Sequence, residues 1–186
     1  MKAFLVGLFW PVFLLLFRLS FEVKTRLTRK SLYVIVDLDN TIADTWPCLV
    51  NNKKGSLFAM HRNLPLIRPV WEEIQRRSKE NDALLVFLSA RPWPLYLVTR
   101  GWIRHKCDGL HELDYQLVLT RSPEEKLVYL RSLRSRGFNV ELYDDMSYGH
   151  ERGAVCYYDH ILVEVKRLEV KHYGLDFINR CKDESA

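Results

Sequence analysis

Two carboxylates, Asp37 and Asp39, form the strongest chemical signal in the sequence, because they follow an apolar run directly in VIVDLDNTIADT. The run Tyr33–Val36 predicts a strand, and ligands of parallel sheets gather beyond the carboxyl ends of strands. Two carboxylates at positions i and i+2 there can face one small site. One can attack phosphorus to form an aspartyl-phosphate, while the other protonates the leaving oxygen and later activates water. A solvated turn is the alternative interpretation.

Further polar groups follow other expected strands in an order that suits phosphoryl transfer. Ser89 ends the run ALLVFL and can hold a phosphate oxygen, and Arg91 offers a planar fork for two more. Lys126, in SPEEKLVYL, can neutralise charge on the transferred group. Asp144 and Asp145 follow VELY and, with the first carboxylate of DLD, offer the oxygen ligands that a hard cation prefers. Each of these residues alone could be an ordinary turn residue or surface charge, but their occurrence together in this order is improbable by chance.

The motifs DLDNT, LSAR, the lysine of SPEEK and the YDD loop resemble the four motifs of the haloacid dehalogenase-like (HAD) phosphohydrolases, from Ser31 to about Tyr158. The resemblance implies a Mg²⁺-dependent phosphomonoester hydrolase with a doubly wound, Rossmann-like parallel sheet. It implies a nucleophile, a general acid/base and a positioning cation at Asp37, Asp39 and Lys126. It implies substrate-binding roles for Thr41, Ser89 and Arg91, and metal-ligand roles for Asp37, Asp39, Asp144 and Asp145.

Within that superfamily, SARPWPLYLVTRGWIRHKCDG is similar to a segment of polynucleotide phosphatases and certain 5′-nucleotidases, through Ser89, Arg91, Thr99 and Trp102. Met146 stands where those polynucleotide enzymes usually have arginine. The first 30 residues hold six of the 28 basic and one of the 23 acidic residues, so the rest of the chain is neutral. That neutrality makes nucleic acid an unlikely substrate. A nucleotide or polynucleotide end phosphatase stays one alternative, and a non-catalytic membrane adaptor with the same fold stays another.

The residues from Ser31 onwards alternate strand-like and helix-like runs, which predicts a layered α/β domain. Strands are expected at residues 33–36, 83–88, 115–119, 140–143 and 154–158, with residues 160–165 continuing or flanking the sheet. Helices are expected at residues 69–79, 94–105 and 123–136, with Ser122 as N-cap of the last. The intervals between motifs leave no room for a large cap domain. An open site is therefore expected, with residues 51–63 as a basic loop at its rim and a large or lipid-linked phosphate as substrate.

The N-terminal segment is apolar and then basic. Residues 3–17 carry no charged side chain, but a helix of that length reaches only about 22 Å, so a full span needs residues up to Phe21 with Arg18 snorkelling. The basic cluster that follows favours a cytoplasmic side. We therefore expect residues 1–30 to be a membrane anchor and basic linker, and residues 31–186 to be the phosphatase domain facing the cytoplasm. A buried helix is the alternative.

Composition agrees with one globular domain after this segment. The chain has 186 residues, 48% hydrophobic and 27% charged, which excludes a disordered or multi-span membrane protein. Its four cysteines lie far apart, so reduced thiols are expected rather than a zinc site or a disulfide framework. The stripe Leu19, Val23 and Leu27 predicts that the linker forms an interfacial helix on anionic lipid.

Overall fold

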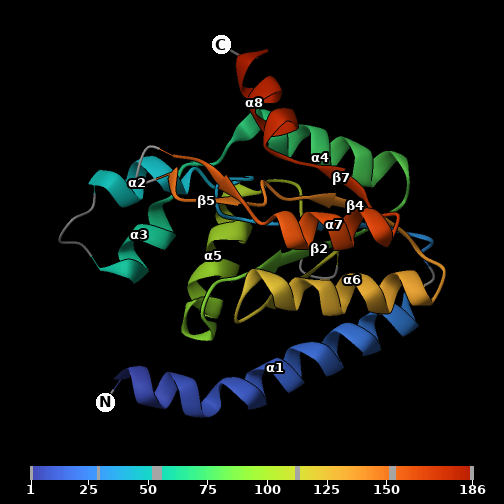
Figure 1. The fold of residues 1–186 in the computed structure, drawn as a ribbon, viewed down its shortest axis with the longest axis horizontal. Coiled ribbons are helices and arrows are strands. Elements are labelled where there is room, and N and C mark those ends of the chain that lie inside the picture. The colour runs from blue at the N-terminus through green and yellow to red at the C-terminus, as the bar shows by residue number, and fades with distance from the viewer. Residues whose placement is uncertain (1, 29, 52–55, 112–113, 151–153, 185–186) are drawn as a thin grey trace.

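The computed structural model describes residues 2–28, 30–51, 56–111, 114–150 and 154–184, without the side chains of residues 2–8 and 51. The fold has three layers, in which a five-stranded parallel sheet is covered by helices on both faces (Figure 1). The predicted α/β class with a parallel sheet is confirmed.

The sheet has the strand order β3-β2-β1-β4-β7, and all neighbouring strands are parallel. Its strands are β1 (Leu32–Val36), β2 (Leu84–Ser89), β3 (Tyr115–Leu119), β4 (Asn139–Tyr143) and β7 (Lys171–Tyr173). The central strands are almost continuous apolar runs because both of their faces are buried. The arrangement places the carboxyl ends of β1, β2 and β4 side by side.

Alternate residues of β1 face two separate cores. Val34 and Val36 pack under α3 (Leu57–Asn63), α4 (Arg68–Glu80), α5 (Tyr96–Lys106) and α8 (Leu175–Asp183). Tyr33 and Ile35 pack under α1 (Lys2–Leu27), α6 (Lys126–Ser135) and α7 (Asp159–Arg167). The remaining elements are α2 (Thr45–Asn51), β5 (Ser147–Tyr148), β6 (Cys156–Tyr157) and the 3₁₀ turns η1 (Trp93–Leu95) and η2 (Pro123–Glu125). The two cores hold the central strand rigidly from both sides.

The chain after Asp145 differs from the prediction. The expected strand at 154–158 is wrong for the main sheet, because β6 pairs only with β5, as an antiparallel ribbon outside it. Residues 160–165 form helix α7 and do not continue the sheet, since Ile161 and Val165 are buried at helical spacing while Val163 is exposed. The last strand of the sheet, β7, was not expected. Ser122 precedes η2, but its side chain makes no capping hydrogen bond.

The intervals between motifs hold only elements of the main fold in the described part of the chain. Helices α2, α3 and α4 lie between Asp39 and Ser89, and η1, α5, β3 and η2 lie between Ser89 and Lys126. Residues 52–55 of the expected rim loop, including Lys53 and Lys54, lie outside the described residues. Residues 57–63 form α3, in which Met60 and His61 are buried rather than at a rim.

The N-terminal segment forms one continuous helix, α1, which extends through the expected linker to Leu27 and contains Pro11. In the described residues, no helix is both long enough and apolar enough to cross a membrane, so the predicted membrane helix is not confirmed. The side chains of residues 2–8, which begin the expected anchor, lie outside the described set. The division of the chain at residue 30 stays a prediction.

Candidate active site

The nucleophile candidate Asp37 lies at the carboxyl end of the central strand. Its backbone N–H donates to the Tyr143 carbonyl at 2.8 Å, which continues the β1–β4 ladder, and its side chain is buried. A tight turn follows, in which Asn40 adopts a φ of 58° and its N–H donates to the Ala43 carbonyl at 2.8 Å. Asn tolerates this left-handed conformation better than most residues. The turn brings Asp39 back toward the end of β2.

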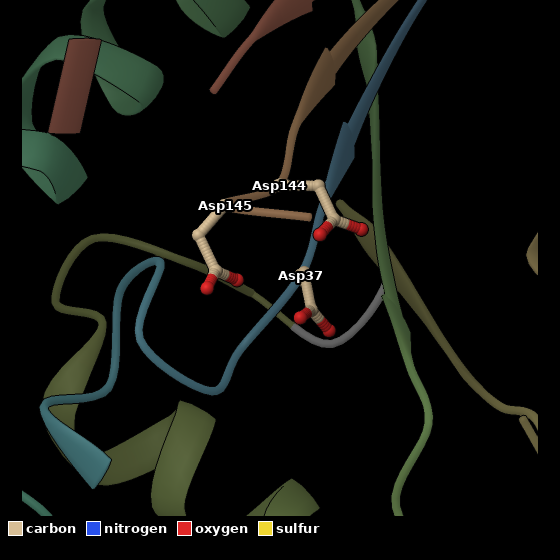
Figure 2. A group of neighbouring side chains, drawn as sticks. All are labelled: Asp37, Asp144 and Asp145. Atoms are coloured by element: carbon tan, nitrogen blue, oxygen red, sulfur yellow. The ribbon is translucent and has the colours of Figure 1, made fainter. Parts of the chain in front are cut away.

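Three buried carboxylates meet where β1 and β4 end. Asp37, Asp144 and Asp145 each offer an oxygen within 4.8 Å of the others, and Figure 2 shows their carboxylates gathered at the same edge. The Asp145 N–H donates to Thr41 Oγ1 at 3.1 Å, and the Met146 N–H donates to Asp144 Oδ1 at 3.0 Å. These bonds fix the loop after β4, so the predicted carboxylates at 37, 144 and 145 do converge. The Thr41 hydroxyl, through its hydrogen bond with the Asp145 N–H, holds this loop in place.

Lys126, at the start of α6, supplies a buried positive charge to this acidic triad. Its Nζ donates to Asp144 Oδ2 at 2.6 Å and lies 3.2 Å from Asp37 Oδ1. The second contact is an ion pair that is not aligned for a hydrogen bond. Asp37 Oδ1 therefore has no hydrogen-bond partner among the described residues, although it is buried. A buried oxygen with an ion-pair contact but no hydrogen bond can still accept a ligand or a metal cation.

Beside Asp37 Oδ1, the Ser89 hydroxyl also lacks a hydrogen-bond partner among the described residues. It ends β2, is buried, and makes no hydrogen bond within the described part of the chain. Ser89 lines the same cavity of about 130 Å³ as Asp37, Lys126 and the carboxylates at 144 and 145. A cavity of this size suits a phosphoryl group and a cation rather than a whole substrate.

An adjoining cavity of about 510 Å³ shares Asn40 and Ser147 with the catalytic cavity. Its walls include the rings of Trp46 and His150, whose centroids lie 6.0 Å apart. A larger groove of about 1060 Å³ lies between α4 and α8, but of the acidic triad only Asp145 reaches it. We place the chemistry in the small cavity, because it holds the carboxylates and the lysine together.

Asp39 lines the same cavity as the acidic triad, but its carboxylate is held in a clamp. Arg91 donates from Nε to Asp39 Oδ2 at 2.8 Å and from Nη2 to Oδ1 at 2.6 Å, and it also donates to Thr99 Oγ1 at 3.3 Å. Thr45 Oγ1 adds a hydrogen bond to Asp39 at 2.7 Å. The guanidinium is only 2% exposed, so its fork holds a carboxylate of the protein. A phosphate-binding role for Arg91 and a metal-ligand role for Asp39 both stay predictions.

The pKa values within the acidic triad are raised. Burial raises the pKa of Asp37 to about 7, and the negative charges of Asp144 and Asp39 add to the effect while Lys126 opposes it. Burial, followed by the charges of Asp144 and Asp37, raises the pKa of Asp145 to about 8. Full ionisation of the triad thus needs more positive charge than Lys126 provides. The acidic triad offers the carboxylate oxygens that a divalent metal ion takes as ligands.

The pKa of Asp39 moves in the opposite direction. Burial acts to raise it, but the charge and hydrogen bonds of Arg91, with the hydrogen bond of Thr45, lower the pKa to about 2. Burial acts to lower the pKa of Lys126, and the charges of Asp144 and Asp37 outweigh it, so this pKa is raised. At neutral pH Asp39 is therefore ionised and Lys126 is charged.

Several polar residues of the site were not anticipated from the sequence. Ser147 Oγ donates to Asp145 Oδ2 and hydrogen bonds with His150 Nε2 at 2.6 Å. His172 Nε2 donates to the Asp144 carbonyl at 2.8 Å. Ser147 lies two residues after Asp145, a spacing that suggests a local turn contact. Nothing in the sequence connects His172, on the unexpected strand β7, with the site.

Comparisons with known proteins do not show a family for this chain. No protein-family model matches the chain, and no curated protein matches it. Among solved structures, the class C acid phosphatase from Bacillus anthracis is similar, with a TM-score of 0.42 and 16% identity. The match covers 77% of this chain and 67% of that one. A likeness at this level carries no weight for the activity, which is inferred below from the site alone.

Proposed function

We propose that the protein is a Mg²⁺-dependent phosphomonoester hydrolase that works through an aspartyl-phosphate. One observation supports this most strongly. A buried carboxylate oxygen of Asp37 and the buried hydroxyl of Ser89, both without hydrogen-bond partners among the described residues, share one cavity with the charged Lys126. A nucleophile, an oxygen-binding donor and a cation in one cavity are the groups that phosphoryl transfer requires.

In the first step, Asp37 attacks phosphorus. A bond forms between its carboxylate oxygen and phosphorus, the bond to the leaving oxygen breaks, and the leaving group takes that electron pair. Lys126 and the Ser89 hydroxyl lie where they can stabilise negative charge on the phosphoryl oxygens. Mg²⁺ held by the triad of Asp37, Asp144 and Asp145 would supply further positive charge to those oxygens when bound.

In the second step, a water oxygen attacks phosphorus and the bond to Asp37 breaks, which releases inorganic phosphate. Asp39 takes the proton of that water, and the Arg91 clamp keeps Asp39 ionised for this role. A general-acid role in the first step requires a proton on Asp39, and the same clamp opposes that. The rate is therefore expected to depend steeply on the acidity of the leaving group.

The substrate is proposed to be a large phosphorylated molecule, with a lipid-linked phosphate as the first class. The small catalytic cavity opens beside the cavity of about 510 Å³, which gives room for a leaving group. The rings of Trp46 and His150 in that second cavity can contact an apolar group or stack on a base. A nucleotide phosphate is for this reason the second candidate.

The test is a metal titration of the full-length protein with an aryl phosphate. We expect turnover to vanish with a chelator and to return with Mg²⁺, and Asp37→Asn to be inactive at every Mg²⁺ concentration. Asp108→Asn, an exposed carboxylate far from the cavity, is the matched control and should behave as the wild type. Activity that survives the chelator contradicts the metal role, and activity in Asp37→Asn contradicts the nucleophile. Inactivity of the wild type on every phosphomonoester tried favours the adaptor.

A further inference from the structure

One face of α1 is bound to the domain along most of its described length. Trp10 and Phe21 are 5% and 1% exposed, and Phe21 packs edge-on against Tyr129 of α6. Nearer the N-terminus, the Phe13 ring stacks on Trp93 with centroids 4.1 Å apart. These contacts lay the helix flat against the domain, below α6 in Figure 1.

Polar contacts fix the same face. Gln116 of β3 donates to Ser20 Oγ at 2.8 Å, and Ser132 of α6 donates to Glu22 Oε1 at 2.6 Å. Arg136 donates to Glu22 Oε2 at 3.3 Å and to Thr25 Oγ1 at 2.8 Å. The C-terminal half of α1 is therefore held as part of the domain.

The opposite face of α1 carries a line of large apolar side chains in solvent, which we name the apolar stripe. Its members are between 48% and 78% exposed: Phe9, Val12, Leu15, Leu16, Leu19, Val23 and Leu27. Their spacing of three and four residues places them on one side of a helix. An exposed apolar surface of this extent marks a place where something binds.

The charges around the apolar stripe identify the kind of partner. Arg18 and Arg26 are exposed on the same helix, whereas Lys24 and Lys30 contact the Tyr115 carbonyl and Asp82 of the domain. The acidic residue of this segment, Glu22, points to α6 instead. An apolar face with cationic neighbours fits the surface of an anionic bilayer. A second copy of the chain would bring two sets of like charges together, which is unfavourable.

We infer that the apolar stripe docks this protein on an anionic phospholipid bilayer, with α1 lying in the plane of the membrane and its other face still packed on the domain. This arrangement differs from a spanning anchor, because α1 does not leave the domain. Phe13 contacts η1, just after the carboxyl end of β2, so the catalytic edge of the sheet lies near the docked helix. Docking is independent of the proposed function, and only the access to a lipid-borne phosphate rests on it.

The first test measures binding of the full-length protein to vesicles of phosphatidylcholine with phosphatidylserine. Leu19→Ser/Val23→Ser removes two members of the apolar stripe without touching the packed face. We expect its partition to fall about 100-fold, since each apolar side chain contributes about tenfold. The matched control is Leu57→Ser/Val163→Ser, which changes exposed residues of α3 and α7 and should bind as the wild type. Equal binding by all three proteins, or no binding by the wild type, overturns the inference.

The second test addresses the charges. Arg18→Gln and Arg26→Gln should each weaken binding about fivefold on vesicles with phosphatidylserine and leave binding to pure phosphatidylcholine unchanged. Thermal unfolding monitors the fold of each variant. If the wild type instead forms a dimer that Leu19→Ser/Val23→Ser abolishes, and does not bind vesicles, the occupant is a second copy and the inference is wrong.

The third test separates an in-plane helix from a spanning one. In a protein with Cys48, Cys156 and Cys181 changed to serine, Ser20→Cys and Gln116→Cys are joined by a short bifunctional maleimide. This link holds α1 on β3. We expect the linked and unlinked proteins to bind vesicles equally. Loss of binding on linking means that α1 must leave the domain, which contradicts in-plane docking whether or not the protein is a phosphatase.

Discussion

Asp37 and Asp39 are two residues apart, yet they lie in opposite electrostatic surroundings. Asp37 is buried with Asp144 and Asp145 against a single lysine, which raises its pKa to about 7. Asp39 is clamped by Arg91, and its pKa is lowered to about 2. The carboxylates around Asp37 carry more negative charge than the one nearby lysine can balance, whereas Arg91 balances the charge of Asp39.

This difference separates the roles of the two carboxylates. In the proposed mechanism, the triad is short of positive charge and holds the cation, and its oxygen without a hydrogen bond attacks phosphorus. A carboxylate already paired with arginine stays ionised and can accept a proton. Pairs of titratable groups with separated pKa values are a feature of catalytic sites. The partners that follow β2 and β4 and that begin α6, rather than the spacing within DLD, create the separation.

The largest expected effect comes from exchanging each carboxylate for an amide. Asp37→Asn should lower kcat by at least about 10⁴-fold, because the attacking oxygen is lost. Asp39→Asn should lower kcat by about 100-fold, because only proton transfer is lost. Steady-state kinetics with Mg²⁺ on an aryl phosphate measures both. Equal losses in the two variants would remove the distinction between the two regions.

The clamp can be opened with Arg91→Gln. The pKa of Asp39 is expected to rise from about 2, because Arg91 no longer opposes the effect of burial. At saturating Mg²⁺, which lowers the pKa of Asp37, the acidic limb of the kcat profile should therefore move to higher pH. We expect kcat at neutral pH to fall about tenfold, as the side chain loses its positioning partner. The pH profile of the variant against the wild type is the measurement. An unchanged acidic limb with lower affinity for substrate instead indicates that Arg91 binds phosphate.

The acidic triad should make metal-free stability depend on pH. Asp37 and Asp145 have pKa values raised to about 7 and about 8, so the folded protein holds protons that the unfolded chain has lost. The contribution of these two groups to the free energy of unfolding is therefore largest at acidic pH. It is lost as the pH rises through their folded-state pKa values of about 7 and about 8. Melting curves with a chelator should show this fall, and Mg²⁺ should reverse it at alkaline pH. Asp145→Asn should flatten the curve, and a wild-type Tm that rises over this range contradicts the expectation.

The smallest effect is expected from Thr45→Val, which removes one hydrogen bond to Asp39 and leaves Arg91 in place. Loss of one charge-assisted hydrogen bond should lower kcat less than about tenfold. Mg²⁺ affinity should not change, because the triad is untouched. An isothermal Mg²⁺ titration is carried out beside the kinetics. Weaker Mg²⁺ binding by this variant would show that the surroundings of Asp39 and the acidic triad act as one site.

Much of the fold could be predicted because the first four strands of the sheet are apolar runs bounded by turn residues. Strand β7, with the sequence KHY, is short and polar and lies at an edge, so it gives no such signal. The segment HILVEV is a short, β-branched apolar run of the kind that forms buried strands, but Ile161 and Val165 also satisfy the helical period, and packing against α6 selects the helix.

The convergence of the carboxylates could be predicted because β1 and β4 each end at an Asp. The partner of Arg91 could not, since a guanidinium fork fits a phosphate and a carboxylate equally well. His172 reaches Asp144 only through the pairing of β7 with β4. On α1 the sequence indicates the stripe Leu19, Val23 and Leu27, which is exposed, but apolar residues surround the first half of the helix so fully that its packed face could not be predicted.

The most direct test of the separated roles is to look for the phosphorylated enzyme. Asp39→Asn is mixed with an aryl phosphate and Mg²⁺, quenched in acid, and digested for mass spectrometry. We predict phosphate on Asp37, at a higher occupancy in Asp39→Asn than in the wild type, because hydrolysis of the intermediate has lost its base. Phosphate on another residue, or substrate turnover without any phosphorylated Asp37 in either protein, would contradict the assignment of Asp37 as nucleophile.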